Sequence, residues 1–208
     1  MRSKRKTLCL CVDKNNEILV RAPLHISERK IEEFVEKHER WIQRRLSERA
    51  ARKKLCLHNG DEIVLFGKEY LIEEGSTAIS DGTIYLPAKE RSKAFQALLK
   101  QLTESYMTAL TQEIAARHAF KFNKIRISSA RSRWGSCSRQ GVVSYTFYLA
   151  FTDEAICRYV AVHELCHTRV FNHGKRFWGE VEKILPDWRE LRSRLRKEEI
   201  VFGYLDEH

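Results

Sequence analysis

The sequence His-Glu-Leu-Cys-His occupies residues 163–167, and a third histidine, His173, follows six residues later. Two histidines four residues apart on a helix leave the same face, so their rings can converge on one ion. Residues 155–166 are apolar nearly all round, which is typical of a buried helix. A divalent cation with its water would satisfy both imidazoles and the Glu164 carboxylate together. The pattern predicts a metal site; the alternative is a pair of hydrogen-bonded core histidines.

The pattern predicts that the three histidines bind the metal and that the glutamate transfers a proton. Neutral ligands from His163, His167 and His173 would leave one zinc ion a fourth position for water, as in a catalytic site. They keep the positive charge of the ion undiminished, which activates water and polarises a substrate carbonyl. Glu164 is placed to accept the proton of the water and pass it to the leaving amine. The predicted reaction is hydrolysis of a peptide bond in a protein or peptide substrate, without a covalent intermediate.

Four residues between 133 and 148 are candidates for substrate binding. Trp134 could line the substrate cleft or close the core beneath Arg133. Tyr145 and Tyr148 could stabilise a tetrahedral oxyanion, although tyrosines in strands are more often structural.

Other residues could rival His173 as the third ligand. Cys137 is one, because cysteine ligates the metal in peptide deformylases that also carry the HExxH pattern; a packed thiol is the favoured interpretation. Glu180 and Glu182 are others, for which a solvated role is favoured over ligation.

Hydrophobic periodicity and turn signals predict a chain of short strands and long helices. Residues 1–88 are expected to form short strands and one long helix that Ser27 caps, and residues 89–208 are expected to form long helices, including the HExxH helix, and a small sheet. The expected strands lie near 8–12, 18–20, 62–66, 69–72, 83–86, 124–128 and 142–149, with turns at 14–16 and 81–82. The expected helices cover about 90–118, a segment from a Thr152 cap to about Val170, and 175–197 with an interruption at Pro186.

Composition narrows the class of protein. The 208 residues are 43% hydrophobic and 32% charged, which is ordinary for a globular chain. The six cysteines form no CxxC pair and are expected to be reduced. No run of residues is apolar enough to span a membrane or to form a signal sequence, so a cytoplasmic location without a membrane partner is expected. The net charge of +10 suits an acidic partner such as nucleic acid, although a solvated surface is the commoner explanation.

Several strings of the sequence resemble the YgjP-like metallopeptidases, a family similar to the SprT-like and Wss1-like proteases and to minigluzincin-type zinc peptidases. They are Arg-Trp-Gly-Ser-Cys-Ser at 133–138, the histidine string at 163–167, Asn-His-Gly-Lys-Arg-Phe-Trp at 172–178 and Pro-Asp at 186–187. The resemblance covers nearly the whole chain. The family usually has a more apolar continuation where this chain has Thr168 and Arg169.

The resemblance implies zinc held by His163, His167 and His173, with Glu164 as the catalytic acid and base. It also implies an α+β fold, in which the N-terminal strands and long helix of residues 1–88 pack on a compact zincin-like domain over 89–208. In that domain a small sheet packs on the active-site helix. Two alternatives remain open. One is a nucleic-acid-associated protein with a structural metal site, or a protease acting near DNA, as some SprT-like relatives do. The other is a different metallohydrolase, such as a deformylase-like enzyme that uses Cys137.

Overall fold

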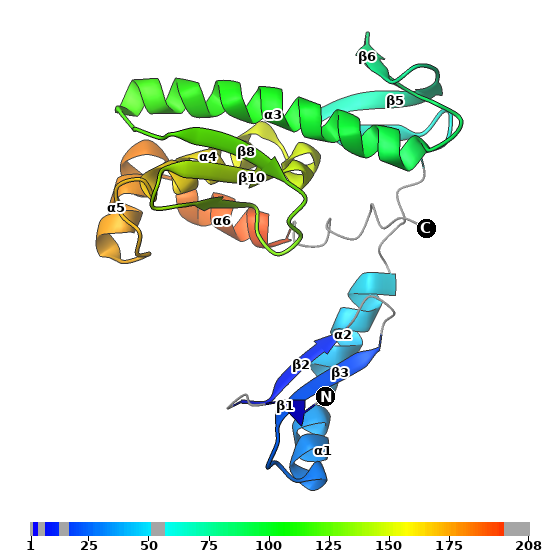
Figure 1. The fold of residues 1–208 in the computed structure, drawn as a ribbon, viewed down its shortest axis with the longest axis vertical. Coiled ribbons are helices and arrows are strands. Elements are labelled where there is room, and N and C mark those ends of the chain that lie inside the picture. The colour runs from blue at the N-terminus through cyan, green and yellow to red at the C-terminus, as the bar shows by residue number, and fades with distance from the viewer. Residues whose placement is uncertain (1, 4–6, 13–16, 51–56, 198–208) are drawn as a thin grey trace. The chain divides into compact units, whose positions relative to one another are not determined.

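The structure is a computed structural model, and it describes residues 2–3, 7–12, 17–50 and 57–197 (Figure 1). The chain divides into two compact units, residues 1–53 and residues 54–208. Residues 62–86, which we group with the N-terminal region from the sequence, lie within the second unit. A division into domains after residue 88 stays a prediction.

The first unit pairs a small sheet with two helices. Strands β1 (Arg2–Ser3), β2 (Cys9–Val12) and β3 (Ile18–Pro23) lie in the order β1-β3-β2, with β2 antiparallel to β3. Helices α1 (Glu28–Lys37) and α2 (Glu39–Ala50) replace the single long helix that periodicity predicts. The chain leaves helical geometry at His38 (φ −106°, ψ 11°), whose ring Nδ1 lies 2.7 Å from the carbonyl oxygen of Phe34. Ser27 occupies the N-cap position without a side-chain cap bond, and the expected turn at 14–16 lies outside the described residues.

The second unit begins with a four-stranded sheet in the order β4-β5-β7-β6. Its strands are β4 (Glu62–Leu65), β5 (Lys68–Glu74), β6 (Ala78–Ser80) and β7 (Thr83–Leu86). The predicted Asp81-Gly82 turn is present, and both residues have positive φ (48° and 74°), as a two-residue hairpin turn requires. The buried face of this sheet packs on the N-terminal half of helix α3 (Arg91–His118) through Ile72, Ile84 and Phe95.

The helix with the HExxH pattern lies in the C-terminal half of this unit. A second sheet contains β8 (Lys124–Ser128), β9 (Gly135–Cys137) and β10 (Val142–Thr146) in the order β8-β10-β9. Helices α4 (Glu154–Cys166), α5 (Lys175–Ile184) and α6 (Trp188–Lys197) follow (Figure 1). Helix α4 packs against α3, α5, α6 and β9, and nine of its residues are buried. The prediction that this helix is buried on nearly all sides is confirmed.

The structure corrects the boundaries of two predicted elements. The strand expected to reach residue 149 ends at Thr146, and Phe147–Phe151 form a 3-10 helix, η1, whose first four residues are all buried. Because these apolar residues are buried all round, their pattern does not distinguish a strand from a helix. Helix α4 is capped by Asp153, whose side chain accepts a 2.9 Å bond from the backbone N–H of Ile156. The predicted cap, Thr152, instead donates its hydroxyl to the carbonyl of Leu149, and α4 ends at Cys166 rather than near Val170.

The other long elements are confirmed. The helix predicted over about 90–118 is α3, and the helical region after residue 175 is interrupted at Pro186 between α5 and α6. Strand β9 is not predicted by the sequence pattern, because three residues are too few to show an alternation. Within the part of the chain that the structure describes, no helix has both the length and the apolar character needed to cross a membrane.

Candidate metal centre

Three histidines meet at the C-terminal end of α4. His163 lies in the last turn of the helix, His167 is its C-cap residue, and His173 lies in the connection to α5. The Nε2 atom of His173 lies 3.0 Å from Nε2 of His163 and 3.1 Å from Nε2 of His167. Among the described residues, these three form a group whose ligand atoms all lie within 4.8 Å of one another and could hold a metal ion. The turn after α4 therefore returns His173 to the other two rings, as the sequence predicts.

The nitrogen positions fit a zinc ion. Zinc–nitrogen bonds of about 2.0–2.1 Å in a tetrahedral site place the ligand nitrogens roughly 3.3 Å apart. The observed Nε2 separations of 3.0 and 3.1 Å are close to that value. The Nδ1 atom of His167 lies 3.1 Å from the carbonyl oxygen of Val170, which can accept its N–H and leave Nε2 free for a metal.

The surroundings keep two of the imidazoles neutral, which metal ligation requires. Burial, and then the neighbouring His167 and His173, lower the pKa of His163 to about 3. Burial is also the main cause that lowers the pKa of His167. The Nδ1 atom of His163 is buried and has no hydrogen-bond partner in the part of the chain described.

Two aromatic side chains of α5 pack against the imidazole rings of the histidine cluster. Phe177, fully buried in the first turn of α5, lies 4.9, 4.4 and 4.8 Å between ring centroids from His163, His167 and His173 respectively. Trp178 lies 5.8 Å from the rings of both His163 and His173 and stacks on Trp188 of α6 at 4.1 Å. We expect this packing to restrict the ring orientations before any metal binds.

The connection that carries His173 is tied to α3. Arg169 donates hydrogen bonds to the carbonyl oxygens of His118 and Ala119 at the end of α3, at 2.7 and 2.9 Å. Its guanidinium lies 4.0 Å from the ring centroid of Phe120 and pairs with Glu180 of α5 at 3.2 Å. Arg169 thus connects α3 to α5 and holds the turn between His167 and His173 in place.

Glu164, next to His163 in the sequence, is buried, which is uncommon for a carboxylate. The residue is 6% exposed, and its Oε2 atom is buried without a hydrogen-bond partner among the described residues. Burial raises the pKa of Glu164 to about 8, and the positive charge of Arg133 acts in the opposite direction. A buried carboxylate whose pKa lies near neutrality can both accept and donate a proton.

Glycine at position 135 makes room for this carboxylate. A Cβ atom on Gly135 would lie 2.7 Å from both Cγ and Oε1 of Glu164. That separation is far below a normal contact, so any side chain at this position of β9 would displace Glu164. The glycine in the 133–138 string is therefore required by the Glu164 side chain of the HExxH helix, which occupies the space beside it.

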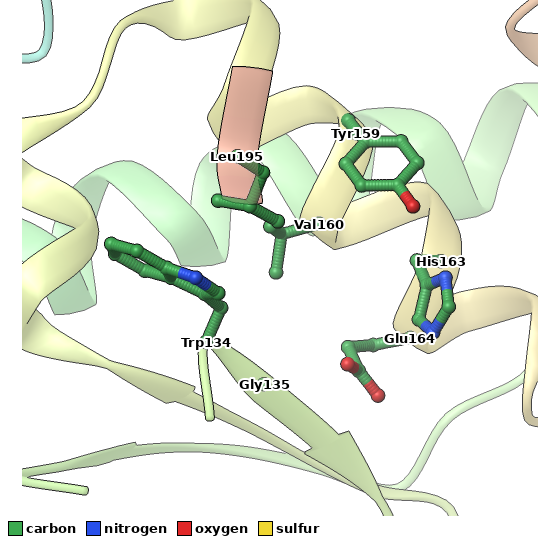
Figure 2. A pocket seen from close by; sticks show the side chains of 7 residues that line it. All are labelled: Trp134, Gly135, Tyr159, Val160, His163, Glu164 and Leu195. Atoms are coloured by element: carbon green, nitrogen blue, oxygen red, sulfur yellow. The ribbon is translucent and has the colours of Figure 1, made fainter. Parts of the chain in front are cut away.

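A pocket of about 180 Å³ opens beside Glu164 and His163 (Figure 2). Its lining residues come from the start of β9, from α4 and from α6; they are Trp134, Gly135, Tyr159, Val160, His163, Glu164 and Leu195. The sequence pattern indicates Trp134 as a residue that could line the cleft, but it does not indicate Tyr159 or Leu195. Tyr159 precedes His163 by four residues, so helical spacing could have found it. Leu195 is brought there only by tertiary packing.

The structure separates the four candidates for substrate binding. Trp134 lines the pocket, and Arg133 is close enough for its charge to lower the pKa of Glu164. Tyr145 and Tyr148 are buried, and neither lines this pocket. The Tyr145 hydroxyl lies 2.9 Å from the hydroxyl of Thr111, and that of Tyr148 accepts a bond from Arg131.

The rival ligands lie outside the histidine cluster. The Cys137 thiol donates to the carbonyl of Ser138, and burial, followed by the charge of Glu164, raises its pKa to about 11, which disfavours the thiolate that ligates metals. Glu180 is paired with Arg169 and Lys183, and Glu182 is paired with Arg189. None of the three carboxyl or thiol groups joins the group of described residues that could hold an ion.

Comparison with known proteins adds a family assignment. The family model described as "YgjP-like, metallopeptidase domain" matches residues 6–198. No curated protein matches the chain at a significant level. The crystal structure of the metallopeptidase zymogen of Pyrococcus abyssi abylysin is 21% identical with a TM-score of 0.41, covering 44% of this chain and 93% of that one. The corresponding structure of Methanocaldococcus jannaschii jannalysin is 19% identical with a TM-score of 0.39, covering 44% and 95%.

Proposed function

The chain belongs to the YgjP-like metallopeptidase family, and from this premise we propose that it is a zinc-dependent peptidase with one ion at the histidine cluster. The family makes it a metal-dependent hydrolase that acts on peptides or proteins. The proposed ligands are His163, His167 and His173, and the proposed acid and base is Glu164. The observation that carries this assignment is the convergence of three Nε2 atoms beside a buried carboxylate whose Oε2 atom has no hydrogen-bond partner among the described residues.

In the proposed reaction Glu164 transfers the proton, and the residues packed around it and around the histidines keep these groups in position. When bound, zinc supplies the Lewis acidity that activates water and polarises the scissile carbonyl. The carboxylate of Glu164 accepts a proton from the attacking water and returns it to the leaving amine. The raised pKa of Glu164 favours both transfers near neutral pH. Packing of Phe177 against the three imidazoles supports their orientation, and Gly135 leaves the carboxylate its space.

The edge of the second sheet offers a place for the substrate backbone. Strand β9 lies at the end of the order β8-β10-β9 and packs against α4. An extended peptide can add to such an edge through main-chain hydrogen bonds. We therefore place the substrate chain along β9, with its scissile bond near Glu164.

Chelation tests the proposed function. We expect the purified protein to cleave an unfolded protein substrate, to lose that activity with a chelator and to regain it with one equivalent of zinc. Cleavage sites identified by mass spectrometry would exclude a contaminating exopeptidase. Full activity in metal-free protein would contradict the proposal.

The alternatives receive less support from the described residues. A deformylase-like site requires Cys137, which lies outside the cluster. A nucleic-acid partner or a role near DNA rests on the net charge of +10. Six of the basic residues lie between positions 44 and 54, and their side chains are outside the described part of the structure; they are Arg44, Arg45, Arg49, Arg52, Lys53 and Lys54. That partner and a cytoplasmic location stay predictions.

A further inference from the structure

We infer that the pocket beside Glu164 binds one uncharged, apolar side chain of the substrate, of about leucine or phenylalanine size, next to the scissile bond. We further infer that Leu195 sets the size limit of this pocket. Both inferences rest on the proposed function, because they assume that a peptide lies across Glu164.

The pocket has a polar end and an apolar end. Figure 2 shows the carboxylate of Glu164 and the ring of His163 at one end, with Trp134, Val160 and Leu195 gathered at the other. A peptide bond that reacts at Glu164 must lie at the polar end. A side chain beside that bond can then enter the apolar end, where it leaves water for contact with hydrocarbon and indole surfaces.

The volume sets the size of the side chain. An engineered apolar cavity of about 150 Å³ in another protein binds benzene. The pocket here, at about 180 Å³, therefore has room for a phenyl or isobutyl group. An alanine methyl group would leave most of it unfilled.

The lining of the apolar end disfavours basic side chains of the substrate. Of the described residues that line it, Glu164 is the one carboxylate, and it lies at the reacting end. A lysine or arginine side chain in the apolar end would lose its hydration without an acidic partner among the described lining residues, so it should bind poorly.

Leu195 is placed to act as the size filter. Leu195 is partly exposed and packs at the edge of the core, whereas Val160 is buried in α4. A substitution at Leu195 therefore disturbs fewer core contacts than one at Val160. The neighbouring Arg194 pairs with Asp153, the N-cap residue of α4. This ion pair ties the C-terminal part of α6 to α4 and holds Leu195 over the pocket.

Peptide binding to an inactive variant tests the inference without requiring turnover. Zinc-loaded Glu164→Gln protein is titrated with fluorescent Gly-Ser-Ala peptides that carry one variable residue, and binding is followed by anisotropy. We expect leucine and phenylalanine peptides to bind about 10- to 100-fold tighter than alanine peptides. Lysine peptides should bind no tighter than alanine peptides. Equal affinity for leucine and alanine, or no binding of any peptide, would overturn the inference.

Substitutions at Leu195 identify the size filter. In the same background, Leu195→Phe should reduce the preference for phenylalanine at least tenfold, whereas Leu195→Ala should admit tryptophan. Ser193→Phe, on an exposed position of the same helix, is the matched control and should leave the profile unchanged. An unchanged profile in folded Leu195 variants would overturn the assignment to Leu195. Preference for leucine by Glu164→Gln, with no hydrolysis by the unsubstituted protein, would contradict the proposed function but support the pocket.

Discussion

Glutamine in place of Glu164 is expected to lower kcat by about 10²- to 10⁴-fold while the protein keeps its zinc. The amide has nearly the same shape as the carboxylate but cannot accept a proton from water. The carboxylate is buried and its Oε2 atom has no partner among the described residues, so its replacement removes a group without breaking an ion pair. Steady-state kinetics on a mapped peptide, with metal analysis of the same preparation, would measure both effects.

The control for this substitution is Glu182→Gln. Glu182 lies on α5 and is paired with Arg189 at the surface, so its loss should leave kcat within about twofold. Undiminished activity in zinc-loaded Glu164→Gln protein would mean that another group transfers the proton.

Alanine at His163, His167 or His173 is expected to weaken zinc binding on the order of 10³-fold. Apparent zinc-binding free energies of about 10–16 kcal/mol for four-ligand sites imply several kcal/mol for each ligand. Competition with a fluorescent chelator would give the affinity, and circular dichroism would show that the variants are folded. Hydrolysis at a fixed low zinc concentration should fall in parallel.

Cys137→Ser is the informative companion to these three variants. Its thiol lies outside the histidine cluster and its raised pKa disfavours the thiolate, so zinc affinity should be unchanged. Loss of zinc in Cys137→Ser with retention in His173→Ala would reverse the ligand assignment and favour a deformylase-like site.

Local sequence patterns were sufficient for the features that depend on helical spacing. The four-residue separation of His163 and His167 placed both rings on one side of α4, and the apolar residues around them predicted its burial. The turn chemistry after residue 170 predicted the return of His173, which the structure confirms. The hairpin turn at Asp81-Gly82 was likewise a local signal.

Features that depend on tertiary packing could not be predicted. Leu195 and Trp134 lie 61 positions apart in the sequence and meet only because α6 packs on α4. The break at His38 lies within a continuous amphipathic pattern, so periodicity alone gave one helix. The close approach of Gly135 to Glu164 also depends on how β9 meets α4.

Anomalous diffraction from crystals of the zinc-loaded protein, recorded above and below the zinc absorption edge, tests the central claim most directly. We predict one anomalous peak per chain that disappears below the edge and lies about 2.0–2.1 Å from the Nε2 atoms of His163, His167 and His173. A peak coordinated by Cys137 in place of one of these histidines, or no peak at the cluster in a zinc-loaded crystal, would contradict the claim.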